Sequence, residues 1–63
     1  MNGDKLRELR KASGKTLRQI SIESDVTESH IRNIEMGLTK NPCISTLIGL
    51  AKALNCEITY FLD

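Results

Sequence analysis

The sequence has few aromatic residues, which limits the size of the core that it can build. Tyr60 and Phe61 are the only two among 63 residues, and tryptophan is absent. A chain of this length buries only about 60% of the surface that it exposes when unfolded. We therefore expect one small domain over residues 1–63. It has no room for a deep substrate pocket, so we do not expect an enzyme.

Long hydrophobic runs are also missing. No apolar stretch approaches the roughly 20 residues that span a bilayer, and residues 1–5 lack the apolar segment of a signal peptide. The sequence therefore predicts a cytoplasmic protein with no membrane partner.

Cysteine and histidine are too few and too scattered for a metal site. Cys43 and Cys56 do not form a CxxC motif, and His30 is the single histidine. A cytoplasmic chain keeps such thiols reduced, and no neighbouring residue clearly lowers the pKa of either one. We expect neither a metal, a cofactor nor a small-molecule ligand.

Charge is distributed unevenly along the chain, although the net charge is only +1. Residues 1–18 contain six basic and two acidic side chains, whereas residues 19–63 contain three basic and six acidic ones. This asymmetry is typical of a domain that turns one face toward phosphates. The alternative explanation of this asymmetry is a basic helix that is simply exposed to solvent.

The hydrophobic spacing is helical throughout, and it predicts an all-α domain of five short helices. These helices are expected at about 4–13, 16–24, 27–36, 43–54 and 57–62. Leu6, Leu9 and Ala12 form the apolar stripe of the first helix. Phe61 and Leu62, together with Ile58, return apolar area to the core from the last one.

The second and third helices have clear boundary signals. Thr16 and Gln19 form a capping box, and Thr27 is a good N-cap. Asp25 tolerates the left-handed backbone that a sharp turn between the helices requires. Val26 and Ile31 occupy the positions of a hydrophobic staple. Two helices joined by such a turn predict a helix-turn-helix.

Four stretches of sequence follow one another in a familiar order. They are T-L-R-Q-I-S at 16–21, V-T at 26–27, I-R-N-I-E-M-G at 31–37, and a tail from N-P at 41–42 to F-L at 61–62. Together they resemble the Cro and phage-repressor type of helix-turn-helix family, also called the xenobiotic-response-element family. The resemblance implies a lambda-repressor-like fold that places its third helix in the DNA major groove. Leu17 departs from the family, which usually has a glutamine there that helps to bind DNA.

Candidate base contacts lie on the third helix. Because Ile31 and Ile34 must point into the core, the opposite surface carries polar side chains whose chemistry suits base edges. They are Glu28, Ser29, Arg32 and Asn33. A merely solvated polar face is the alternative.

Candidate phosphate contacts frame this helix in the family geometry. They combine helix N-termini with basic and polar side chains, and they are Thr16, Arg18, Thr27, Lys40 and Asn41. The family pattern also pairs Arg10 with Glu35, which joins the first helix to the end of the third.

The function implied by the resemblance is sequence-specific binding of double-stranded DNA by a homodimeric transcriptional regulator, a repressor rather than an activator. Ile22 lies off the apolar stripe of its helix, and it and Tyr60 are candidates for a protein interface. The alternative function is a protein-binding module of the same fold, such as an antitoxin or an adaptor.

Overall fold

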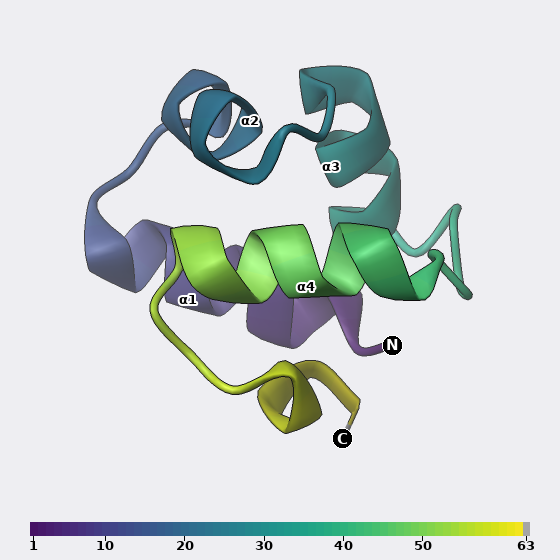
Figure 1. Ribbon diagram of the computed structural model, residues 1–63. Helices are drawn as coiled ribbons and strands as arrows, with labels where there is room; N and C mark the ends of the chain where they lie inside the picture. Colours follow the sequence, from purple (N-terminus) through teal and green to yellow (C-terminus); the bar gives the residue numbers. More distant parts are fainter. Residues whose placement is uncertain (63) are drawn as a thin grey trace.

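The computed structural model describes residues 1–62 as four α-helices and a closing 3-10 helix. The elements are α1 (Gly3–Ser13), α2 (Leu17–Ser24), α3 (Glu28–Glu35), α4 (Ile44–Ala53) and η1 (Ile58–Leu62). In Figure 1, α4 lies in front of α1. Helices α2 and α3 lie above these two helices, and η1 lies below them. The predicted all-helical class is confirmed, but the fifth element is a 3-10 rather than an α-helix. None of the helices formed by residues 1–62 is long and apolar enough to cross a membrane.

Short polar and glycine signals set the ends of α1. The side-chain oxygen of Asn2 accepts hydrogen bonds from the amides of Asp4 and Lys5, at 3.0 and 3.3 Å. Gly14 ends the helix with a φ of 73°, in the left-handed region that glycine adopts without steric cost. Gly14 therefore supplies the C-terminal stop of α1.

Every element contributes to the core. The side chains that lose essentially all contact with solvent are Leu6, Ile20, Ile31, Ile34, Leu50 and Phe61. Burial of each one stabilises the fold by about 1.5–3 kcal/mol relative to an exposed position. The helices therefore hold one another in place around a single shared cluster.

Two residues expected in the core are exposed. Leu62 is 54% exposed, because a 3-10 helix has three residues per turn and brings Ile58 and Phe61 onto one face, leaving Leu62 beside it. Ala12 is exposed because each step of three residues falls short of a full α-helical turn. By the second step from Leu6, the stripe has moved about 120° around the axis.

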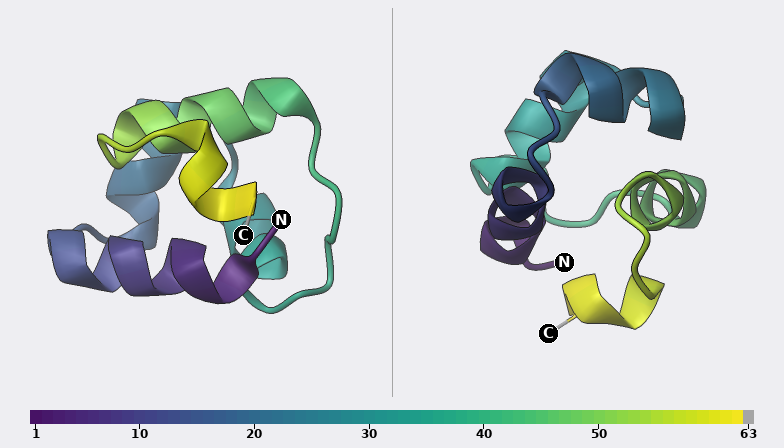
Figure 2. Two further views of the ribbon diagram at one scale, coloured as in Figure 1. Left: turned by 90° about the horizontal axis from the view of Figure 1, so that it is seen from below. Right: turned by 90° about the vertical axis from the view of Figure 1, so that its left-hand side faces the viewer.

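The two helices of the helix-turn-helix pack on different partners. α2 lies against α4, and α3 lies against α1, as the two views in Figure 2 show. A glycine sits at each joint. A Cβ atom on Gly49 would lie 2.5 Å from the carbonyl oxygen of Ser24, and one on Gly3 would collide with the carbonyl oxygen of Ile34. Neither close approach was predicted from the sequence.

Candidate nucleic-acid interface

The turn between α2 and α3 is held by local hydrogen bonds. Asp25 has a φ of 62°, and its amide donates to the carbonyl of Ser21 at 2.9 Å. The Ser24 hydroxyl accepts from the amide of Val26 at 3.3 Å, and the Thr27 hydroxyl accepts from the amide of His30 at 3.2 Å. The left-handed turn at Asp25 and the N-cap at Thr27 are thus both confirmed.

α3 has one buried and one exposed face. Ile31 and Ile34 are buried, at 0% and 1% exposure. The four predicted base-contact residues are all exposed, and within residues 1–62 their side chains make no hydrogen bond or ion pair. They are Glu28, Ser29, Arg32 and Asn33. α3 is therefore packed into the core on one side, and the polar side chains on its other side face solvent.

The N-terminus of α2 is arranged as a capping box. The Thr16 hydroxyl accepts from the Gln19 amide at 3.1 Å, and the Gln19 side-chain oxygen accepts from the Thr16 amide at 2.8 Å. The amides of Leu17 and Arg18 are left to bind an anion, and the Thr16 hydroxyl keeps its proton as a donor. The Leu17 side chain packs against the core and is not directed to a ligand.

The loop after α3 is hydrogen-bonded to the end of that helix. Gly37 has a φ of 79°, and the amides of Leu38 and Thr39 both donate to the carbonyl of Asn33, at 2.9 and 3.2 Å. Lys40 and Asn41 follow on this loop and are exposed. The loop that carries two of the predicted phosphate contacts is therefore hydrogen-bonded to α3 at its start.

Arg10 and Glu35 form the ion pair that the family pattern predicted. Nε of Arg10 donates to Oε2 of Glu35 at 2.7 Å, and a terminal nitrogen donates to Oε1 at 3.0 Å. The side chains are 17% and 6% exposed. The hydrogen bonds that Arg10 donates to Glu35 raise the pKa of the Arg10 guanidinium above its ordinary value. This bidentate pair joins α1 to the C-terminus of α3.

Lys15 is one basic residue of the N-terminal segment that is already neutralised. Its ammonium donates to Glu23 at 2.6 Å and to the carbonyl of Ala53 at 2.7 Å. It links α2 to the end of α4, and its role was missed in the sequence because neither partner is near it in the chain. The positive charge available to bind phosphates is therefore smaller than the number of basic residues in the N-terminal segment suggests.

The two predicted protein-interface residues differ in their surroundings. Ile22 is 71% exposed on α2. Tyr60 is 42% exposed, and its ring lies under the ammonium of Lys5, at 5.5 Å, and edge-on to Phe61. The Tyr60 ring therefore already contacts other side chains of the fold, whereas most of the Ile22 side chain is in contact with solvent.

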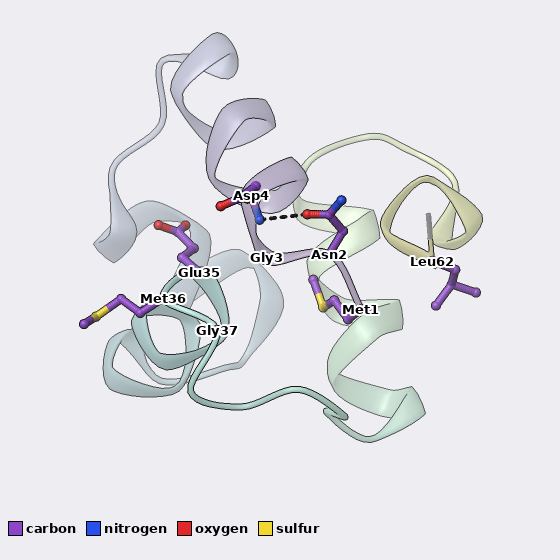
Figure 3. Close-up of a pocket in the computed structure, with 8 residues that line it drawn as sticks. All are labelled: Met1, Asn2, Gly3, Asp4, Glu35, Met36, Gly37 and Leu62. Carbon is purple, nitrogen blue, oxygen red and sulfur yellow. Dashed lines mark hydrogen bonds between the residues drawn. The ribbon is translucent and has the colours of Figure 1, made fainter.

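A hollow of about 600 Å³ lies between the start of α1, the end of α3 and the end of η1 (Figure 3). The carboxylate of Glu35 borders it and is engaged by Arg10. None of the residues predicted to contact DNA lines this hollow. Its lining residues are Met1, Asn2, Gly3, Asp4, Glu35, Met36, Gly37 and Leu62.

The two thiols have different environments. Cys43 is exposed at the N-cap of α4, where the hydroxyls of Ser45 and Thr46, at 3.2 and 3.3 Å from its sulfur, lower its pKa to about 7. Burial raises the pKa of Cys56, and Glu57 adds to the effect. The expectation that nothing lowers either thiol pKa is wrong for Cys43. Residues 1–62 contain no group of three or more side chains suited to a metal ion.

Comparison with known sequences places the chain among bacterial regulators. It is 33% identical over its 63 residues to the HTH-type transcriptional regulator SlrR of Bacillus subtilis, covering 41% of that protein. It is 42% identical over 53 residues, 84% of this chain, to an uncharacterised HTH-type transcriptional regulator, y4dL of Sinorhizobium fredii, covering 26% of that protein. The chain thus spans less than half the length of these relatives.

Solved structures resemble this fold closely. The restriction-modification controller protein C.AhdI of Aeromonas hydrophila superposes with a TM-score of 0.87 and 30% identity, over 94% of this chain and 88% of that one. SinR, a master regulator for biofilm formation solved in complex with DNA, superposes with a TM-score of 0.93 and 28% identity over all of both chains. The model of the family described as Helix-turn-helix matches residues 6–61. The chain therefore belongs to the helix-turn-helix family.

Proposed function

We propose that this chain is the DNA-binding part of a transcriptional regulator and reads double-stranded DNA through α3 in the major groove. The exposed face of α3 carries the proposal, because its four polar side chains have no partner within residues 1–62 while its opposite face is fully buried. The names of the relatives support the same function: SlrR is a transcriptional regulator, and SinR has been solved in complex with DNA.

Each exposed side chain of α3 suits a particular base edge. The guanidinium of Arg32 matches O6 and N7 of guanine, and the amide of Asn33 matches N6 and N7 of adenine. Glu28 accepts from N4 of cytosine, and Ser29 serves either as donor or as acceptor. The N-terminal half of such a helix is the part that contacts bases.

Phosphate contacts are proposed around this face. Thr16 and the two unused amides of α2 form one anion site, and the hydroxyl of Thr27 is a second donor at the start of α3. Arg18, Lys40 and Asn41 are exposed and add charge and hydrogen bonds. Each phosphate neutralised adds about 0.9 to the salt slope of binding, so one copy that uses three or four of them binds weakly.

Weak binding by one copy favours a homodimer. Two-fold dimers of this motif read half-sites about 34–36 Å apart. The Cα atoms of one copy extend over 22 × 21 × 19 Å, which is less than this spacing, so two copies fit on neighbouring half-sites without overlap. We propose repression as the mode of action, because a bound dimer covers the DNA and needs no further component to exclude another protein. We propose no catalytic activity, cofactor or small-molecule ligand.

The first test is the selection of bound duplexes from a randomised pool at about 100 mM salt. We expect a two-fold symmetric consensus. Arg32→Ala and Asn33→Ala should each relax one position of it and weaken binding by about 1–3 kcal/mol. Arg7→Ala is the matched control, because Arg7 is exposed on α1 and its loss removes the same charge without removing a base contact.

A protein-binding module is the second candidate function, and the exposed Ile22 favours it. An antitoxin or adaptor of this kind would show no sequence enrichment in the selection, although circular dichroism reported a folded protein. That outcome would overturn DNA recognition by α3. A consensus that is unchanged by Arg32→Ala and Asn33→Ala would overturn the assignment of those residues.

A further inference from the structure

The exposed face of α3 continues past its last polar residue to Met36, the C-cap of the helix. The backbone of Met36 is still helical, with φ and ψ of −83° and −3°, and its amide donates to the carbonyl of Arg32 at 2.9 Å. Met36 follows Arg32 by four residues and Ser29 by seven, and seven residues fall within about 20° of two full turns. The three side chains therefore project from the same side of α3, opposite the buried Ile31 and Ile34.

The Met36 side chain is 62% exposed, so it contributes little to the core. Although it borders the hollow between α1, α3 and η1, it points away from Met1 and Leu62 on the opposite wall (Figure 3). Met36 is thus an apolar member of a face whose other exposed side chains are polar. Those side chains are Glu28, Ser29, Arg32 and Asn33.

The chemistry of methionine limits what Met36 can bind in DNA. Its side chain has no N–H or O–H group, and its sulfur is only a weak acceptor. It therefore cannot donate a hydrogen bond to a phosphate oxygen or to O6 and N7 of guanine. Base edges in the major groove present donors, acceptors and one apolar group, the C5 methyl of thymine. That methyl is the group that suits an apolar side chain on this face.

We propose that Met36 reads a thymine, through contact between its thioether side chain and the C5 methyl group in the major groove. The proposal rests on the proposed function, because it requires α3 to lie in the groove. It adds a specificity-determining residue at the C-terminal end of the exposed face. The three rotatable bonds of methionine allow its tip to reach a base edge from that end.

The position of Met36 on α3 predicts where this thymine lies in the DNA site. Met36 follows Asn33 by three residues and Arg32 by four, which corresponds to about 4.5 and 6 Å along the helix axis. Successive bases of one strand are about 3.4 Å apart along the duplex. The thymine should therefore lie within about two base pairs of the positions that Arg32 and Asn33 read.

Ile22 provides a contrast with Met36. It is 71% exposed, but it lies on α2, and a single exposed apolar side chain is ordinary surface. Contact between α3 and DNA does not require the removal of water from Ile22. Met36 lies on the face that enters the groove, so its apolar surface leaves water when DNA binds. Only a variant of Met36 should therefore change the preference for a methyl group.

The expected effect is the burial of one methyl group. Burial of a group of this size is worth about a fourfold change in an equilibrium constant. Removal of the thymine methyl alone should therefore weaken binding about fourfold. Truncation of Met36 removes more apolar surface than one methyl, and it should weaken binding about four- to tenfold.

The test compares thymine with uracil at each thymine of the selected consensus. Uracil lacks only the C5 methyl and keeps every hydrogen-bonding group, so the exchange removes the proposed contact alone. Affinities are measured for the wild type and for Met36→Ala, Met36→Leu and Ile22→Ala. All three substitutions are neutral and lie at exposed positions, so they preserve the fold and the charge presented to DNA. Thermal unfolding checks that each variant is folded.

We expect one thymine, close to the positions read by Arg32 and Asn33, at which uracil weakens binding of the wild type about fourfold. Met36→Ala should bind the thymine and uracil duplexes equally at that position. Met36→Leu should keep the preference, because leucine is apolar and of similar volume. Ile22→Ala should behave as the wild type on both duplexes.

An equal preference for thymine in the wild type and in Met36→Ala overturns the inference, as does loss of this preference in Ile22→Ala. A consensus with no thymine within about two base pairs of the positions relaxed by Arg32→Ala and Asn33→Ala also overturns it. These results leave the proposed function standing, because a consensus has been found. If no duplex is enriched by the folded protein, the proposed function fails, and the reading of thymine by Met36 fails with it.

Discussion

The two halves of the helix-turn-helix are attached to the rest of the molecule by different kinds of joint. α3 is attached to α1 by the close approach of Gly3 and Ile34 and by the shielded ion pair between Arg10 and Glu35. α2 is attached to α4 by the close approach of Ser24 and Gly49, with the exposed pair of Lys15 and Glu23 beside it.

The two joints differ in how much stability is lost when a charged residue is removed from each. At the α1–α3 joint the charges are removed from water, so each charge depends on its partner. At the α2–α4 joint the backbone surfaces fit closely, and the charged pair remains in contact with water, where it contributes little. The orientation of α3 therefore depends on a shielded ion pair in addition to the close approach of Gly3 and Ile34, whereas that of α2 depends mainly on shape.

The largest effect is expected from Arg10→Ala. It leaves the buried carboxylate of Glu35 without its partner, at the negative end of α3, and should lower the free energy of unfolding by about 3–5 kcal/mol. DNA binding is then lost because α3 is loosened. Thermal unfolding measures this effect, with Arg7→Ala as the control. An unchanged melting temperature would show that the pair is not what fixes α3.

A smaller effect is expected from Gly49→Ala. The added methyl meets the carbonyl of Ser24, and relief of this overlap requires α2 and α4 to move apart, at a cost of about 1–3 kcal/mol. The better helix propensity of alanine returns up to about 1 kcal/mol. Denaturant unfolding measures the difference, and Ser45→Ala on the exposed side of α4 is the control. A gain in stability would contradict the close fit of this joint.

Lys15→Met should have a still smaller effect. The side chains of Lys15 and Glu23 are 32% and 44% exposed, and solvent screens such pairs to about 0–1 kcal/mol. Methionine keeps most of the aliphatic length of lysine, so the charge and the hydrogen bond to the carbonyl of Ala53 are what is lost. Denaturant unfolding at low and at high salt checks the prediction. A loss as large as that of Arg10→Ala would erase the contrast between the two joints.

The two thiols also differ in exposure, since Cys43 is exposed and Cys56 is partly buried. We expect this difference to affect their reactivity and not the stability of the fold. The thiolate is the reactive form, so alkylation of Cys43 should rise with pH through about 7, its pKa. Cys56 should react only at more alkaline pH, because burial raises its pKa. Mass spectrometry of partly alkylated protein measures both rates. Ser45→Ala should shift the Cys43 curve to higher pH, and an unshifted curve would rule out the hydroxyl as its cause.

Local signals and the family spacing were enough to predict the Arg10–Glu35 ion pair, the ends of α2 and α3, and the face of α3 that is exposed. The capping box at Thr16 and the turn at Asp25 depend on residues close together in the chain. The periodicity of Ile31 and Ile34 similarly fixed which face of α3 is exposed. The pairing of Arg10 with Glu35 came from the family pattern.

The α2–α4 joint depends on tertiary geometry and was not predictable in the same way. A glycine within a helix does not reveal that another backbone approaches it, so Gly49 gave no signal. Lys15 looked like one more basic residue until its partners were located in α2 and α4. Leu62 was misplaced because an apolar pattern does not distinguish three residues per turn from 3.6.

The exposed face of α3 has a consequence for the evolution of this domain. Because Glu28, Ser29, Arg32 and Asn33 support nothing else within residues 1–62, substitutions there should change stability by no more than about 0.5 kcal/mol. Under the proposed function, target preference and foldability are therefore under separate selection in this chain. A lineage that keeps both joints is free to drift to a new DNA sequence through these four positions while the scaffold stays as it is.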